Sequence, residues 1–274
     1  MKRFASTALA VLAMAPFLAA QDPVTEQPPA APSVPEEVKV WVDKLGKLVG
    51  KAAEYDMTMV MDMEAQGQKM KMSSTGHILM LDETHMRATM KMNIEMEIMP
   101  AMEMNLLTVM DGQTMWIESD NPMMGKQIMK ADVAVMKKLQ AQGTSMSPGG
   151  NMNQLAQIQD LFTNFFQNFE VTEADGKVTI TGDITEEIAE RGDFAGMGLT
   201  RFRMVLDAKS GFPIETAMGD GKKDAMVIQL KNLKFPKKEE IAKDAFTYEP
   251  PEGSPVMDIG AMMGAMGEGG GEGF

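Results

Sequence analysis

The chain has 274 residues, and its 39 acidic against 26 basic side chains give a net charge of −13 at pH 7. Such a surface repels phosphate groups, because affinity for them rests on Lys and Arg releasing counterions. Nucleic acid and anionic lipid headgroups are therefore excluded as expected partners. The sequence contains no cysteine, so it offers neither a disulfide framework nor a cysteine for lipid attachment.

The first twenty residues have the pattern of a secretory signal peptide. Lys2 and Arg3 precede an apolar run from Phe4 to Leu18, and two alanines follow before Gln21. No later stretch reaches the roughly 20 apolar residues that a membrane helix needs. We expect an exported periplasmic protein that is soluble, monomeric, not itself lipidated and not stably inserted in a membrane.

The rest of the chain divides into one ordered unit between two low-complexity ends. Residues 21–35 hold five prolines, and residues 259–274 are rich in glycine and methionine. Neither segment can bury enough apolar surface to fold. We therefore predict a signal peptide over 1–20, a disordered leader over 21–35, one domain over 36–258 and a disordered tail over 259–274, since β-rich folds of this length commonly share one core.

The predicted domain begins with an amphipathic helix from Glu36 to Glu54. After this helix, apolar residues recur at every second position instead of every three to four. Methionines alternate with polar residues over 55–63, 70–80 and 86–98, a pattern typical of long antiparallel strands with one wet face. His77 and His85 fall in the polar phase and should point to solvent. Shorter strands are predicted near 102–110, 114–118, 126–130, 171, 177–182, 200–207, 212–218 and 225–235, about eleven strands in all.

Two helical segments interrupt the strands. The first covers 131–142, and the second, with apolar residues at helical spacing from Leu155 to Phe169, is much more hydrophobic. We therefore predict a mainly β fold with helices (α+β), built on a single strongly curved antiparallel sheet whose concave face the helices cover.

The usual signatures of an enzyme are missing from the sequence. It has no cysteine, only two histidines, no phosphate-binding glycine loop and no nucleophile elbow. The acidic residues are spread over polar strand faces, where solvation explains them. We predict no catalytic residue, no metal ligand and no cofactor.

Methionine is the unusual feature, with 32 in the chain. The methionines could simply replace Leu, Ile and Val in the closed core of a structural envelope protein. Their thioethers could instead bind Cu(I), as the close spacing in MTMVMDM suggests. A third hypothesis is that the methionine face lines a cavity for flexible acyl chains, because rotatable, polarizable side chains repack around varied ligands.

Three stretches resemble the periplasmic lipoprotein carriers of the LolA family. TVMDGQTMWIESDNP (108–122) is similar to the family's strand, Asp-Gly turn and aromatic-bearing strand, and FRMVLDAKSGFPIETAM (202–218) is similar to a family hairpin. The closing segment VIQLKNLKFPKKEEIAKDAFTYEPPEGSPVMDI (227–259) resembles the family's extended Phe-x-Tyr/Phe-x-Pro-Pro-x-Gly end.

The resemblance implies a half-open β-barrel that carries acylated lipoproteins or other lipids, with envelope membrane transfer proteins as possible partners. Its apolar cavity would include Met57, Met59, Met61, Met90, Met92, Met104 and Trp116. Its lid would include Leu155, Leu161, Phe162, Phe165 and Phe166. Arg87 is the positional match to a family arginine that latches the lid, although the proline usually near it is missing. Transfer would need no covalent chemistry, because acyl chains would replace the lid's apolar contacts.

Overall fold

The computed structural model describes residues 34–48, 50–65, 68–97, 99–122, 125–136, 162, 165–186 and 198–260. The predicted signal peptide, residues 21–33 of the leader and residues 261–274 of the tail lie outside the described residues, as do Leu155 and Leu161 of the predicted lid. No helix within the described ranges is long and apolar enough to cross a membrane.

Helix α1 spans Glu36–Gly46, which is shorter than the predicted segment. Two glutamates in its first turn stabilise the helix, because their negative charges lie at the positive end of the helix dipole. Gly46 and Gly50 weaken the helical tendency beyond that point, and the chain enters its first strand at Ala53. The buried residues of α1 follow the helical period: Val38, Trp41, Val42 and Leu45.

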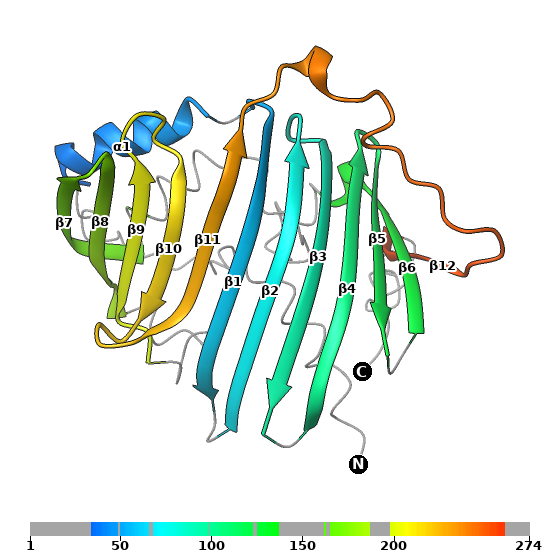
Figure 1. The fold of residues 1–274 in the computed structure, drawn as a ribbon, viewed down its shortest axis with the longest axis horizontal. Helices are drawn as coiled ribbons and strands as arrows, with labels where there is room; N and C mark the ends of the chain where they lie inside the picture. Colours follow the sequence, from blue (N-terminus) through cyan, green and yellow to red (C-terminus); the bar gives the residue numbers. More distant parts are fainter. Residues whose placement is uncertain are drawn as a thin grey trace, which may run out of the picture.

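The rest of the described chain forms one open sheet of 12 strands, which Figure 1 shows as a bent, unclosed surface. In chain order, its strands are β1 (Ala53–Ala65), β2 (Gln68–Met80), β3 (His85–Met96), β4 (Met99–Asp111), β5 (Thr114–Asn121), β6 (Gly125–Asp132), β7 (Phe166–Ala174), β8 (Lys177–Ile184), β9 (Arg201–Asp207), β10 (Pro213–Gly219), β11 (Asp224–Lys234) and β12 (Val256–Asp258). A short 3₁₀ turn, η3 (Lys238–Glu240), lies between the last two strands.

The spatial order is β12-β6-β5-β4-β3-β2-β1-β11-β10-β9-β8-β7. Neighbouring strands are antiparallel except for β12, which runs parallel to β6. The pairing of β1 with β11 joins the two halves of the chain in the middle of the sheet. The predicted mainly β architecture with one large, mostly antiparallel sheet is confirmed, and β12 is a strand that the alternation did not reveal.

Among the described residues, helical segments pack at both ends of the sheet. Helix α1 lies at one end, and the helical residues Val133 and Met136 are buried with Leu106, Met115 and Ile117 at the other. The buried side of α1 packs against residues of β8 and β9, including Val178, Ile180 and Phe202. The second predicted helix is wrong at its C-terminal end, because Phe166 already begins β7. The first predicted helix starts later than expected, since β6 continues to Asp132, which then accepts hydrogen bonds from the backbone N–H groups of Ala134 and Val135.

After β11, residues 235–258 of the closing segment pass over the ends of the neighbouring strands and finish in β12, beside β6 (Figure 1). Phe246 is buried and its ring lies edge-on to His85, with 5.7 Å between centroids. The Tyr248 ring packs on Trp116 at 5.4 Å. Its hydroxyl donates a 2.5 Å hydrogen bond to Glu118 Oε2, so two aromatic contacts and one charged hydrogen bond hold this segment on β3 and β5.

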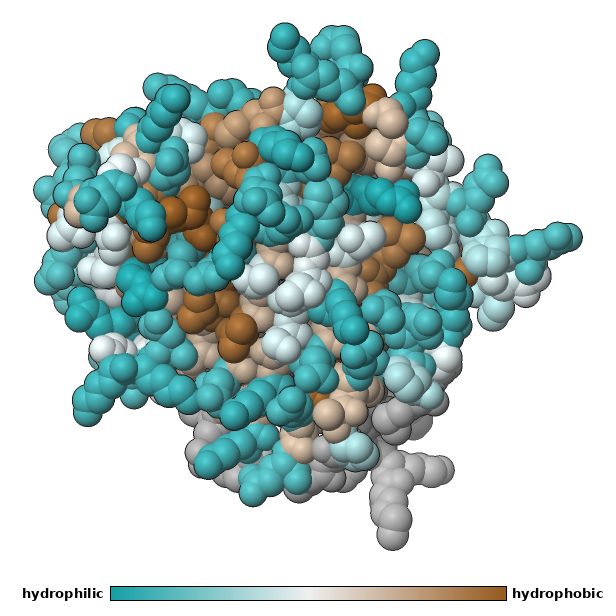
Figure 2. All heavy atoms as spheres, in the orientation of Figure 1, coloured by the Kyte–Doolittle hydropathy of each residue, from teal (hydrophilic) through white to brown (hydrophobic). Residues whose placement is uncertain are grey.

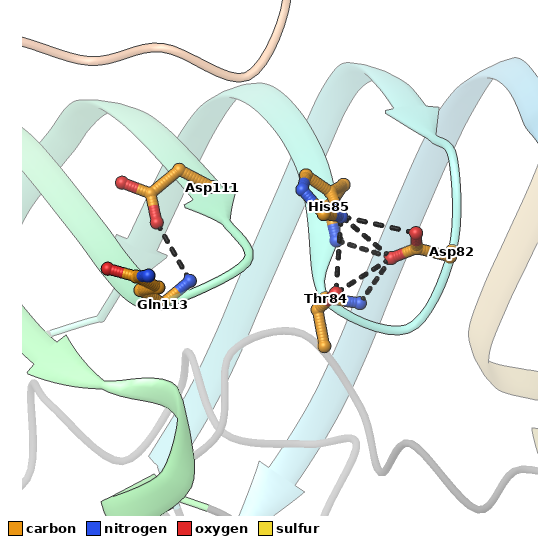
Figure 3. Close-up of polar contacts among 5 residues, drawn as sticks. All are labelled: Asp82, Thr84, His85, Asp111 and Gln113. Carbon is orange, nitrogen blue, oxygen red and sulfur yellow. Dashed lines mark hydrogen bonds and ion pairs between the residues drawn. The ribbon is translucent and has the colours of Figure 1, made fainter. Parts of the chain in front are cut away.

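The turns beneath that segment are held by side-chain acceptors (Figure 3). Asp82 Oδ1 accepts hydrogen bonds from the backbone N–H groups of Thr84 (2.8 Å) and His85 (2.9 Å). Asp111 Oδ1 does the same for Gln113 and for the residue after it. Burial acts to raise the pKa of Asp82, but the hydrogen bonds from Thr84 and His85 outweigh it and lower that pKa to about 2.

Candidate functional site

The candidate site is the side of the sheet that carries the alternating methionines, here called the methionine face. In strands, residues i and i+2 point to the same side, so the strand registers decide which side chains share it. Across β11, β1, β2, β3 and β4 the face includes Met226, Met57, Met59, Met61, Met63, Met70, Met72, Met90, Met92, Met96, Met102 and Met104.

The registers place these methionines in rows that cross the strands. One row runs from Met226 through Met61 and Met72 to Ile94 and Met102. Directly opposed residues of antiparallel strands have Cβ atoms about 4.5–5.5 Å apart, within reach of one another's side chains. The face is therefore a continuous thioether surface rather than a set of separate methionines.

Most of this surface is protected from solvent. The exposed fraction is 0% for Met61, 1% for Met72 and 2% for Met92, and half-buried methionines such as Met59 and Met102 pack around them. At the β5 border, Asn121 Nδ2 donates a hydrogen bond to the Met102 sulfur at 3.3 Å.

The methionine face carries no Asp, Glu, Lys, Arg or His at its positions on β1 to β4. Its one titratable group there is the Tyr55 phenol, whose pKa burial raises, so it is neutral at physiological pH. Charged residues of the same strands lie on the other side, where Asp56 pairs with His77 at 2.9 Å and Lys91 pairs with Glu103 at 2.9 Å. The register thus separates a neutral face from an ionic one.

A groove of about 600 Å³ lies on the ionic face, over the middle of β1 to β5. Its lining includes Asp56, His77, Lys91, Glu118 and Asp120. Figure 2 shows this side of the molecule as mostly hydrophilic with separate hydrophobic patches. The groove is thus on the opposite side from the predicted acyl cavity and has the wrong polarity for an acyl chain.

Six of the predicted cavity residues share one side of the sheet. Met57, Met59, Met61, Met90, Met92 and Met104 all belong to the methionine face. Trp116 does not, because it pairs with Val109 while its neighbours Met115 and Ile117 point to the other side. The alternation within β5 could have revealed the side of Trp116. Met115 and Ile117 mark the apolar side of the strand, so the residue between them must point the other way.

Arg87 also lies on the ionic face, on the side of β3 away from the methionine face. Its register partner is Val109, and its guanidinium donates to the backbone carbonyls of Ala245 and Thr247, each at 3.4 Å. Arg87 therefore contacts the closing segment, and its latch role stays a prediction.

The predicted lid phenylalanines gather at the far end of the sheet under α1. Phe162, Phe166 and Phe202 are buried together, and the Phe166 and Phe202 rings stack with centroids 3.7 Å apart. Phe165 is partly buried against the same cluster. Helical spacing grouped Phe162, Phe165 and Phe166 in the sequence. It gave no sign of Phe202, which comes from a strand some 40 residues later.

This arrangement can hold apolar groups, but it offers little for acid or base chemistry. Within the described residues, no group of three or more His, Cys, Asp or Glu side chains is placed to hold a metal ion. Thioethers and aliphatic groups neither donate protons nor carry charge at neutral pH. The site therefore suits binding by exclusion of water.

No protein-family model matches the chain, and no curated protein matches it significantly. Solved structures similar to it include a LolA superfamily protein from Nitrosomonas europaea, at 9% identity and a TM-score of 0.27 over 77% of this chain and 97% of that one. A DUF1329 family protein from Desulfovibrio piger aligns at 10% identity and a TM-score of 0.27, over 77% and 97% of the two chains. An outer-membrane lipoprotein-sorting domain from Vibrio parahaemolyticus aligns at 10% identity and a TM-score of 0.23, over 75% and 95%.

The family named from the sequence is thus represented among the structural neighbours. At these identities and TM-scores, the likeness adds no argument to the strand order and registers of the chain itself. The methionine face has to be interpreted from its own chemistry.

Proposed function

We propose that this protein is a periplasmic carrier or binding protein that holds the acyl chains of a lipid or lipoprotein against its methionine face. The observation that carries the proposal is the separation of charge: β1 to β4 have a continuous neutral thioether side and an ionic side. A sixteen-carbon chain that leaves water for such a surface gains at most about 12 kcal/mol, at about 0.8 kcal/mol per methylene and before ordering costs.

Methionine suits an exchangeable apolar surface. Its three rotatable bonds let it fill space in the empty protein and repack around a ligand. A Leu, Ile or Val face of the same area would bury as much surface but would adapt less to chains of different length. In this mechanism, acyl chains replace apolar contacts on the face during loading, and delivery reverses that exchange without covalent chemistry.

Co-purification with lipid tests the proposal directly. The protein is purified from the periplasm, extracted with organic solvent and analysed by mass spectrometry for acyl lipids and acylated peptides. The exchange Met59→Glu places a charge on the half-buried edge of the methionine face, where an unpaired carboxylate is costly to cover. Thr58→Glu is the matched control, because Thr58 is the adjacent residue on the ionic face.

We expect wild type and Thr58→Glu to carry lipid, and Met59→Glu to lose it while keeping its circular dichroism spectrum. Wild-type protein that is consistently free of lipid, and that takes up none from vesicles, would refute the proposal. It would then favour a structural envelope protein with a closed core.

Cu(I) binding is the second candidate, and the registers give it one specific argument. Met61 lies directly opposite Met72, and Met63 lies opposite Met70, which brings four soft thioethers into one patch. Replacing all four with leucine keeps the volume and apolar character. A copper site would lose stoichiometric Cu(I) uptake in that variant, whereas an acyl-binding face would keep its lipid.

A further inference from the structure

The methionine face contains one polar side chain that has no partner in the described structure. Ser74 is 2% exposed, and its Oγ is the one buried side-chain N or O atom within the described ranges that makes no hydrogen bond. An unsatisfied buried hydroxyl is costly to the folded state. Such exceptions in a folded protein call for an explanation.

The surroundings of Ser74 explain why its hydroxyl lacks a partner. Its directly opposed neighbours are Met59 on β1 and Met92 on β3, and the neighbouring positions on its own side of β2 are Met72 and Gly76. A thioether sulfur is a weak acceptor, and Ser74 Oγ makes no hydrogen bond to any of them. The hydroxyl is therefore enclosed by groups that cannot satisfy it.

The strand also changes character at this point. Along the methionine face of β2, the large residues Met70 and Met72 give way to the small residues Ser74 and Gly76. A Cβ atom on Gly76 would lie 2.9 Å from Met90 Cγ, so the flexible Met90 side chain packs over the space that a larger residue would fill. Small side chains beside movable methionines make this the part of the face where a ligand atom can most readily approach the strand.

We propose that Ser74 Oγ donates a hydrogen bond to the carbonyl oxygen of an acyl ester bound on the methionine face. This inference rests on the proposed acyl-binding function and names the polar contact within that site. An ester oxygen can accept a hydrogen bond but not donate one, so a hydroxyl complements it. The neutral face has no counter-ion for a charged headgroup, whereas a carbonyl at the end of an apolar chain matches one hydroxyl in an apolar surface.

Two lysolipids that differ in one group test the contact. Hexadecanoyl-lysophosphatidylcholine has the ester carbonyl, and its hexadecyl ether analogue lacks it while keeping the chain and headgroup. Binding is measured by isothermal titration below the critical micelle concentration, for wild type, Ser74→Ala and Ser73→Ala. Ser73 is the matched control because it is an exposed serine one residue away on the ionic face.

Wild type and Ser73→Ala should bind the ester about three- to tenfold more tightly than the ether, which is the effect of one neutral hydrogen bond. Ser74→Ala should bind both lipids with the affinity that wild type has for the ether. Equal affinities in wild type, or a preference that persists in Ser74→Ala, would overturn the Ser74 contact while leaving acyl binding intact. Binding of neither lipid by wild type would refute acyl binding itself, and the contact with it.

A third probe separates the two sources of such an ester. A synthetic peptide with a dipalmitoyl-glyceryl cysteine presents the same carbonyl on a lipoprotein anchor. Tighter binding of this peptide than of dipalmitoylphosphatidylcholine, which carries the same two chains, would assign the ester to a lipoprotein, and the reverse order would assign it to a free lipid.

Thermal unfolding of the empty protein gives an independent readout. Removing an unsatisfied hydroxyl should raise the melting temperature of Ser74→Ala by about 2–4 °C, while Ser73→Ala should leave it unchanged. A lower melting temperature for Ser74→Ala would show that the hydroxyl has a stabilising partner in the empty protein, and would overturn its assignment to a ligand.

Discussion

Truncating Met61 tests whether the methionine face is the packed side of the sheet. Met61 is 0% exposed and lies in register between Met72 on β2 and Met226 on β11. Met61→Ala removes Cγ, Sδ and Cε, and at about 0.8 kcal/mol for each methylene-sized group the transfer term is about 2.5 kcal/mol. With a partly collapsed cavity, we expect a loss of about 3 kcal/mol in the free energy of unfolding.

The neighbouring residue provides the control. Val60 is 55% exposed on the ionic face, so Val60→Ala should change the free energy of unfolding by less than about 0.5 kcal/mol. Met61→Leu keeps the volume and should cost less than about 1.5 kcal/mol. Met61→Ala thus reports the loss of side-chain volume, and Met61→Leu reports the loss of the sulfur alone. Val60→Ala reports a truncation on the ionic face.

Urea unfolding followed by fluorescence is a suitable assay, since Trp41 lies on the buried side of α1 and Trp116 lies on the ionic face under the closing segment. We expect a lower midpoint for Met61→Ala with an unchanged slope against urea concentration. If Val60→Ala cost as much as Met61→Ala, the register of β1 would be inverted and the assignment of the two faces would be wrong.

Three further perturbations test other parts of the structure. Asp82→Asn should lower the free energy of unfolding by about 1 kcal/mol at pH 7, a figure discounted because the side chain is partly exposed. Since the folded-state pKa of Asp82 is depressed to about 2, this difference should be present above about pH 4 and vanish as the pH falls toward 2; a difference that stays constant in urea titrations across that range would contradict it. Tyr248→Phe removes the hydrogen bond to Glu118, so amides of β12 should exchange with deuterium faster, and unchanged exchange would mean that this bond does not hold the segment. Gly76→Ala places a Cβ 2.6 Å from the Thr89 carbonyl oxygen, so we expect a lower melting temperature, equivalent to about 1–3 kcal/mol, and an unchanged one would show that β3 can yield there.

The sequence predicts which residues share a side of each central strand, because alternation is a local property. Met57, Met59 and Met61 share a side of β1 whatever the rest of the chain does, since successive strand residues point to opposite faces. The same reasoning assigned Met90, Met92 and Met104 to one side of the sheet, which the registers show. The predicted site failed at Trp116, where an aromatic residue was assigned to the cavity against the parity of its own strand.

Helical spacing was a weaker guide than strand alternation. Phe162, Phe165 and Phe166 fit a helical stripe, yet Phe166 is the first residue of β7. An apolar run can satisfy either period over a few residues, and its packing partners then decide between them. Here the decisive partner is Phe202, whose ring stacks on Phe166 and which no local pattern connects to it.

The two-faced character of the strands and the neutral, methionine-rich chemistry of one side can be predicted from the sequence, because both follow from residue identity and a period of two. Contacts between residues far apart in the chain become known only from the folded structure. It pairs β1 with β11, docks the closing segment on Trp116 and Arg87, and leaves the Ser74 hydroxyl without a partner. The physical reason is that pairing, docking and hydrogen-bond satisfaction depend on neighbours in space, and the local pattern does not specify those neighbours.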